Sequence, residues 1–327
     1  MEQQQFVGLD VSQAETAVCV VDAAGAVLWQ GKCASTPEAI AATLRRRAPG
    51  AIRIALETGP LSTWHWRALD ALGLPVVCID ARHAKAALAM QVNKTDANDA
   101  LGLAQIVRTG WYREVRVKSE ASHRTRSLLA ARAKLVEMRR EVSHQIRGLL
   151  QTFGRLVGVA GTGQAFEARV RELAEDDPAL STAAAALLGA RAALAEQIAR
   201  LDKMLLAQAR HDTASRRLMT VPGVGAITAL AFVATIDDPG RFRRSASVGA
   251  YLGLTPRRYQ SGMTDISGHI SKAGDTLLRG YLFEAATTLL TRVQRSSALK
   301  AWGVRLTGRI GLKRARVAVA RKLGVTC

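Results

Sequence analysis

The sequence predicts an α/β domain at the N-terminus followed by a mostly helical remainder. Short β-rich runs alternate with helical segments over the first hundred residues, and apolar residues recur at a spacing of seven from about Glu120 onward. Glycine-flanked turns separate short helices in the last hundred residues. With 327 residues, 48% of them hydrophobic, the chain can bury more than one core. The predicted domains are 1–118, 119–213 and 214–327.

The N-terminal domain is expected to begin with three short strands separated by turns, over residues 6–11, 17–21 and 26–29. Thr36 as N-cap and Pro37 at the first helical position start a helix that ends near Arg47. The elements expected next are a strand over 51–57, a helix over 61–72 closed by Gly73, a strand over 75–79, and helices over 81–90 and 96–109. An antiparallel meander that feeds a partly parallel sheet is the order of the ribonuclease H fold.

The middle of the chain is predicted to form two long helices. The residues that repeat at seven are Leu128, Leu135, Val142 and Leu149 in the first helix, and Leu187, Leu194 and Leu201 in the second. A glycine-rich break over 154–163 separates them. This pattern predicts a helical hairpin or coiled-coil pair, and simple amphipathic packing onto a domain is the alternative.

A glycine turn opens the last hundred residues. Val221-Pro-Gly-Val-Gly-Ala is typical of a helix-hairpin-helix, in which Gly223 and Gly225 would expose backbone N–H groups to a DNA phosphate. Gly-Val-Gly also occurs in ordinary helix–helix corners.

Positive charge is concentrated in the later two thirds of the chain. The 46 Lys and Arg residues outnumber 27 Asp and Glu, which gives a formal net charge of +19. Residues 1–100 carry a net charge of −1, residues 101–220 one of +8 and residues 221–327 one of +12. This division predicts that acidic residues of the first third carry the chemistry. The two basic segments that follow are expected to contact nucleic acid.

The sequence argues against the membrane and secreted classes. Residues 1–5 lack a basic or apolar signal region, and the apolar run over 226–236 is too short to span a bilayer. The four cysteines have no zinc-type spacing, so reduced core thiols in a cytoplasmic protein are expected.

Four acidic residues lie at the ends of predicted elements. Asp10 and Glu57 end strands, and Asp96 and Asp99 lie three apart at a helix start, on one face. In a ribonuclease H sheet the first and fourth strands are neighbours and the final helix packs against their ends, so the four carboxylates are expected to converge. Cations would relieve their repulsion, which predicts two Mg²⁺ ions about 4 Å apart, with Mn²⁺ as the substitute. Each residue taken alone is also typical of a turn or a helix cap.

A polar, glycine-punctuated loop over 252–274 is the second candidate site. A hydroxyl there could attack a phosphodiester while cations hold the phosphate. The cations close by in sequence are Arg257, Arg258 and Lys272. Chemistry alone leaves the choice of hydroxyl open among Ser261, Ser267, Ser271 and Thr264.

These motifs together resemble a known family. VGLDVS, ALETGP and NKTDANDA, joined by VPGVG, LGLTPRRYQSG and SKAGD, are similar to the IS-one-ten family of insertion-sequence transposases, also called Piv-like or DEDD transposases. The resemblance runs from about residue 6 to 322, and LTPRRY-x-SG is its most specific segment. It implies a RuvC-like N-terminal domain, a coiled-coil middle and a C-terminal transposase domain.

The resemblance also implies roles for individual residues. Asp10, Glu57, Asp96 and Asp99 would bind metal, and Ser261 would be the nucleophile that forms a covalent phosphoserine link to DNA. The implied partners are donor and target DNA, a structured non-coding guide RNA encoded by the element, and further copies of the chain, from dimer to tetramer. The implied location is the bacterial cytoplasm, at the nucleoid.

The C-terminus departs from the family pattern. Relatives usually continue further after the segment that ends at Leu323. Here Gly324 is expected to end the last helix before a short tail.

Three rival functions remain open. A RuvC-type nuclease would use water and form no protein–DNA link. An actin-like ATPase or sugar kinase shares the strand order but needs a glycine-rich phosphate turn, which Asp10-Val-Ser-Gln lacks. A non-catalytic nucleic-acid-binding protein would explain the charge but not the four carboxylates.

Overall fold

The computed structural model describes residues 4–89, 93–158 and 163–327. The chain divides into two compact units, Met1–Val117 and Lys118–Cys327. The predicted domain boundary at residue 118 stays a prediction. The further division of the second unit near residue 213 stays a prediction.

The first unit contains a five-stranded sheet. Its strands are β1 (Gln5–Val11), β2 (Glu15–Asp22), β3 (Val27–Ala34), β4 (Ala51–Glu57) and β5 (Val76–Ile79). The spatial order is β3-β2-β1-β4-β5, with β1, β2 and β3 antiparallel and β4 and β5 parallel to β1. The predicted ribonuclease H order is confirmed.

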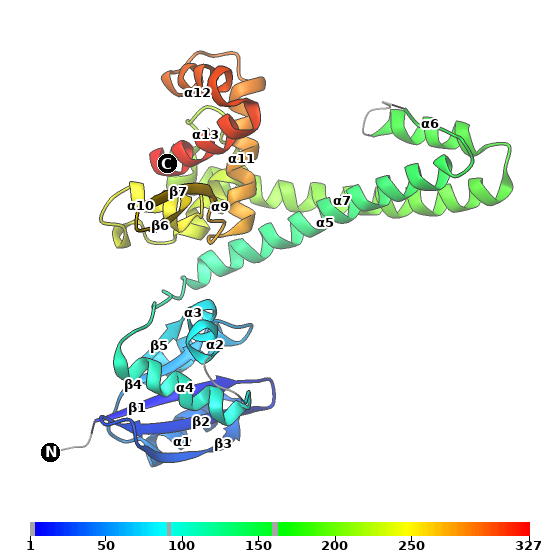
Figure 1. Cartoon of the computed structure of the whole chain (residues 1–327). Helices are drawn as coiled ribbons and strands as arrows, with labels where there is room; N and C mark the ends of the chain where they lie inside the picture. The colour runs from blue at the N-terminus through cyan, green and yellow to red at the C-terminus, as the bar shows by residue number, and fades with distance from the viewer. Residues whose placement is uncertain (1–3, 90–92, 159–162) are drawn as a thin grey trace. The chain divides into compact units, whose positions relative to one another are not determined.

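Helices cover both faces of this sheet, drawn in blue and cyan in Figure 1. They are α1 (Pro37–Arg47), α2 (Ser62–Ala71), α3 (Ala81–Leu88) and α4 (Asp96–Thr109). Val7 and Leu9 of β1 pack with α1 and α2, whereas Phe6 packs on the opposite face with α3 and α4. Because side chains alternate along a strand, Gly8 and Asp10 share the α4 face with Phe6. The predicted end of α3 at Met90 lies outside the described residues.

Gly8 allows α4 to lie directly on β1. A Cβ atom at this position would stand 2.0 Å from the Ala100 carbonyl oxygen and 2.5 Å from the Ala104 nitrogen, both backbone atoms of α4. Any side chain at residue 8 would therefore push the whole helix away from the sheet.

We expect Gly8→Ala to lower the free energy of unfolding by about 3 kcal/mol or more, because the backbone of α4 must move to accommodate the methyl group. Denaturant unfolding measures this. Gly59→Ala is the matched control, since a Cβ atom there meets nothing within 4 Å. Equal stability of the two variants would show that α4 can shift without cost.

The second unit is mostly helical. Its helices are α5 (Glu120–Gln151), α6 (Gln164–Ala174), α7 (Pro178–His211), α8 (Thr213–Leu218), α9 (Ala226–Ile236), the 3₁₀ turn η1 (Pro239–Arg241), α10 (Ala246–Tyr251), α11 (Thr276–Thr291), α12 (Ala298–Ile310) and α13 (Leu312–Thr326). A two-stranded hairpin, β6 (Pro256–Ser261) and β7 (Thr264–Ile270), stands between α10 and α11.

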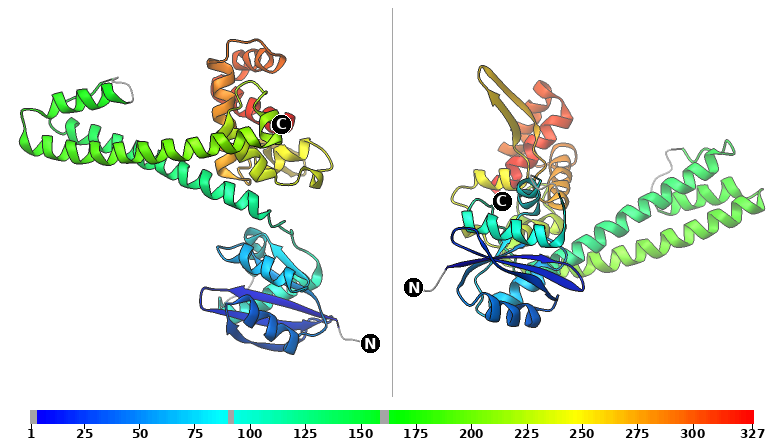
Figure 2. Two further views of the ribbon diagram at one scale, coloured as in Figure 1. Left: turned by 180° about the vertical axis from the view of Figure 1, so that it is seen from behind. Right: turned by 60° about the horizontal axis from the view of Figure 1, so that its bottom comes forward.

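Helices α5 and α7 run side by side, with α6 at their far end (Figures 1 and 2). Leu129, Ile146 and Leu150 are the fully buried apolar residues of α5, whereas the residues at the predicted spacing of seven are only partly buried. The two long helices are confirmed. A coiled-coil register between them stays a prediction.

By length and composition α7 could cross a membrane, a feature that the sequence expectation missed. Its central Arg191 is buried, and its guanidinium donates to Glu167 of α6 at 3.0 Å. Arg132 of α5 pairs with Asp202 of α7. The helix therefore packs against α5 and α6 through charged as well as apolar contacts.

The main core of the second unit gathers α9, α11 and α13, and the beginning of α5 is tied to it. Asp237, just after α9, accepts hydrogen bonds from the Ser119 backbone N–H (3.0 Å) and the Ser122 hydroxyl (2.6 Å), in the first turn of α5. Arg126 of α5 donates to Asp275 at 2.7 Å. These bonds fix the direction in which α5 leaves the core.

Two expectations for the second unit are wrong. Gly324 does not end the last helix, because α13 continues to Thr326. A Cβ at Gly324 would lie 2.9 Å from Leu252 Cδ1, so the glycine serves close packing. The segment after Leu254 is not a loop throughout but contains the β6–β7 hairpin. In addition, helix α6 was not expected from the sequence.

Candidate active site

Asp10 and Glu57 lie on neighbouring parallel strands. The residues before them, Leu9 and Leu56, are paired in the register of β1 and β4, which places both carboxylates at the same edge of the sheet. Ala55 packs with α4, so Glu57, two residues further along, is on the α4 face as Asp10 is. The expected neighbourhood of these two residues is confirmed.

Helix α4 brings the other two carboxylates to this edge. The Thr95 hydroxyl accepts a hydrogen bond from Asn98 N at 3.2 Å and caps the helix, which puts Asp96 and Asp99 in its first turn. The close contact at Gly8 holds the helix against β1 two residues before Asp10. Sheet order, N-cap and glycine together determine where these four side chains lie.

The carboxylates act on one another electrostatically. Burial raises the pKa of Asp10 above its ordinary value of 3.8, and repulsion from Asp99 and Asp96 raises it further. Burial likewise raises the pKa of Glu57, with repulsion from Asp10 and then Asp99 adding to the effect. Negative charge therefore concentrates at the ends of β1 and β4 and makes this edge attractive to a cation.

Two lysines near this edge were not among the candidate residues. Lys94 lowers the pKa values of Asp10 and Glu57, which places its positive charge near both. Lys32 of β3 donates to Asp96 at 3.0 Å. The ion pair holds Asp96 toward β3, while Asp99 is the helix residue that acts on both Asp10 and Glu57. Only the tertiary structure shows the Lys32–Asp96 pair, because the two residues are 64 apart in sequence.

The donor set fits a divalent cation such as Mg²⁺. All four groups offer carboxylate oxygens, the ligands that Mg²⁺ prefers, and a bound cation would relieve the repulsion between Asp10 and Glu57. Within the described ranges, no three acidic, His or Cys side chains already form a compact metal-binding group. Asp10, Glu57 and Asp99 are the residues best placed to hold an ion, and Asp96 could join them on leaving Lys32.

A small cavity opens beside Glu57. Its volume is about 200 Å³, and its lining comes from the segments that follow β1 and β4, including Ser12, Gln13 and Ser62. The Glu57 side chain therefore borders an open cavity.

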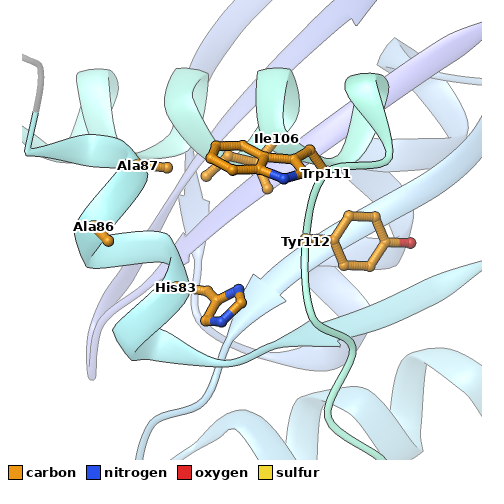
Figure 3. Close-up of a pocket in the computed structure, with 6 residues that line it drawn as sticks. All are labelled: His83, Ala86, Ala87, Ile106, Trp111 and Tyr112. Carbon is orange, nitrogen blue, oxygen red and sulfur yellow. The ribbon is translucent and has the colours of Figure 1, made fainter. Parts of the chain in front are cut away.

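A second hollow of the same unit, about 420 Å³, is distinct in chemistry. Helix α3 contributes His83, Ala86 and Ala87, and Ile106, Trp111 and Tyr112 come from α4 and the segment after it (Figure 3). The indole of Trp111, 81% exposed, lies over Ile106. None of these lining residues is acidic, so this hollow offers no carboxylate to a metal ion.

Ser261 ends strand β6 in the second unit. It pairs with Thr264 across the turn formed by Gly262 and Met263. Every residue of β6 is exposed, so the Ser261 hydroxyl is accessible. Ser267 is an exposed residue of β7, and Ser271 follows that strand.

The cations predicted to contact DNA lie on and beside the β6–β7 hairpin, and their side chains have different partners. The Arg258 guanidinium donates to Asp265 at 2.8 and 2.6 Å, and Arg257 donates to the Ser271 carbonyl at 3.2 Å. Lys272 adopts a positive φ of 55° after β7. The cations predicted near Ser261 are thus grouped on and beside the hairpin.

The glycine turn is partly explained by packing. A Cβ at Gly223, which has a φ of 89°, would lie 2.6 Å from the Ala285 carbonyl oxygen of α11. Gly225 is exposed and begins α9 as its N-cap. A helix-hairpin-helix that contacts phosphate stays a prediction, and Gly225 is the glycine accessible for it.

Comparison with known proteins identifies the family. A DEDD transposase model for IS110 elements matches residues 7–154, and a model described as the transposase IS116/IS110/IS902 family matches residues 215–302. A Sinorhizobium fredii protein named "Putative transposase y4pF/y4sB" is 34% identical over 265 residues, which cover 79% of this chain and 67% of that protein. The chain belongs to the IS110 family of transposases.

A further relative matches almost the whole chain. The transposase for insertion sequence element IS1111A of Coxiella burnetii is 29% identical over 327 residues, 98% of this chain and 88% of that protein. A Thermus thermophilus RuvC structure covers 34% of this chain and 99% of its own, at 15% identity and a TM-score of 0.26. As an IS110 transposase, the protein is a DNA-cutting enzyme whose substrate is DNA.

Proposed function

We propose that this transposase cuts and rejoins DNA through a covalent link between Ser261 and a DNA phosphate, with two Mg²⁺ ions held by Asp10, Glu57, Asp96 and Asp99. The observation that carries the proposal is the gathering of acidic side chains from β1, β4 and α4 at one sheet edge, where Asp10 and Glu57 have raised pKa values. Carboxylates gathered at one edge of a sheet are typical of metal-assisted phosphoryl transfer.

The reaction is a transesterification. The Ser261 Oγ attacks phosphorus, an Oγ–P bond forms, and the bond from phosphorus to the leaving sugar oxygen breaks. The hydroxyl proton passes to solvent, and the leaving oxygen takes up a proton, so no redox change occurs. Two bound Mg²⁺ ions would supply charge stabilisation for the attacking and leaving oxygens. Rejoining is the reverse step, with a DNA hydroxyl attacking the phosphoserine.

Further partners are proposed on charge and family grounds. The net charge of +12 over residues 221–327 supports contact with polyanions beyond one DNA strand, and we propose a structured guide RNA encoded by the element. The carboxylates and Ser261 belong to different compact units. We propose that several copies of the chain act together as an assembly. Their proposed location is the nucleoid in the cytoplasm.

The direct test is strand cleavage of end-labelled element DNA with and without Mg²⁺. With Mg²⁺ or Mn²⁺ we expect cleaved DNA that keeps a bound peptide after protease digestion, and with a chelator neither product. Cleavage that continues in the chelator would contradict the metal assignment.

A water-using nuclease of the RuvC type is the second candidate. It is favoured by the one observation that the carboxylates form their cluster within a unit that lacks Ser261. Protease-treated products separate the two functions, because a nuclease leaves DNA ends without attached peptide.

A further inference from the structure

The β6–β7 hairpin projects from the helices of its unit (Figure 2, right). All of β6 is exposed, and only Ile270 of β7 is partly covered. Tyr259 is 65% exposed, Ile266 58% and Met263 at the tip fully. Two-stranded hairpins are marginal alone, and exposed apolar side chains gathered on one element mark an interaction site.

The two faces of the hairpin differ in chemistry. Tyr259 pairs with Ile266 and Ser261 with Thr264, so these four side chains share one face. Gln260 pairs with Asp265 on the other face. There Arg258 and Asp265 form a two-bond ion pair, which leaves the apolar contacts and the hydroxyl of Ser261 on the opposite side.

Charge indicates a nucleic acid as the occupant of the Ser261 face. Asp265 is the sole acidic residue of segment 256–272, and it is neutralised by Arg258. Arg257 and Lys272 add positive charge at the base of the hairpin. A phosphate that reaches the Ser261 hydroxyl must also lie along this face, and Tyr259 stands about 7 Å further along the strand.

We propose that Tyr259, supported by Ile266, stacks on an unpaired DNA base next to the phosphate that Ser261 attacks. The proposal rests on the proposed function and adds a positioning residue to it. Aromatic rings stack on any base, and apolar side chains such as Ile and Met wedge between base steps. This face of the hairpin would thereby hold the DNA strand, with its bases unstacked, beside the Ser261 hydroxyl.

The test uses the full chain and single-stranded DNA that carries one 2-aminopurine. We expect Tyr259→Ala to weaken binding about tenfold and to remove the fluorescence change that stacking produces. The slope of affinity against salt should stay unchanged, because stacking releases no counterions. Tyr259→Phe should restore wild-type binding, since it keeps the ring.

Gln260→Ala is the matched control, an exposed residue of the same strand on the opposite face, and should bind as the wild type does. Ser261→Ala should retain stacking, so a wrong nucleophile assignment would not disturb this measurement. Equal binding by Tyr259→Ala and Gln260→Ala would overturn the proposal. The proposal would also be overturned if Tyr259→Ala weakened binding to RNA alone. The same holds if Tyr259→Ala changed the oligomeric mass in light scattering and left the affinity for DNA intact.

Discussion

Replacing Ser261 by Ala is expected to abolish covalent protein–DNA adducts and to reduce strand cleavage by about 10⁴-fold or more, because the variant lacks the attacking oxygen. DNA affinity should remain close to that of the wild type, since the lost hydroxyl is exposed and small. Denaturing gels with labelled DNA measure the adduct, and filter binding measures the affinity.

The neighbouring hydroxyls provide the controls for Ser261. Thr264 faces Ser261 across the turn, and Ser267 lies further along β7. Thr264→Ala and Ser267→Ala should both keep adduct formation. An adduct that survives in Ser261→Ala but disappears in one of these variants would reassign the nucleophile.

Replacing Asp10 by Asn is expected to lower strand cleavage by about 10³-fold while making the first unit more stable at neutral pH. The loss arises because a neutral amide binds a divalent cation poorly. The gain arises because burial and then repulsion from Asp99 and Asp96 disfavour the Asp10 charge, as its raised pKa indicates. Cleavage rates and thermal unfolding measure the two effects.

The pH dependence has a definite sign. A carboxyl group with a raised pKa in the folded state binds its proton more tightly there than in the unfolded chain, so stability falls as pH rises from its ordinary value of 3.8 through the raised value. Asp10→Asn should lessen this fall. Asp70→Asn, on the exposed side of α2, is the control that should change neither activity nor stability. An Asp10→Asn enzyme with full activity would contradict the metal site.

The first unit was predictable because its signals are local. Thr36 with Pro37, and Thr95 before Asp96, are caps that fix where α1 and α4 begin. The apolar runs of β1 and β4 end in acidic residues, and the strand order then placed Asp10 beside Glu57. Each step needed only neighbouring residues and a general rule of sheet topology.

The missed features leave no clear local signal in the sequence. The strands β6 and β7 are exposed on both faces and lack the alternation that marks a half-buried strand. Gly324 is a helix-ending residue by propensity, yet packing against Leu252 retains it inside α13. The ion pairs that hold Asp96 and Arg258 join side chains whose partners sequence alone does not specify.

The most direct measurement is mass spectrometry of the peptide left on DNA after cleavage, protease digestion and nuclease trimming. We predict a nucleotide attached through phosphate to Ser261, formed with Mg²⁺ and absent with a chelator. A nucleotide on another residue, or cleaved DNA without any attached peptide, would contradict the serine-linked reaction.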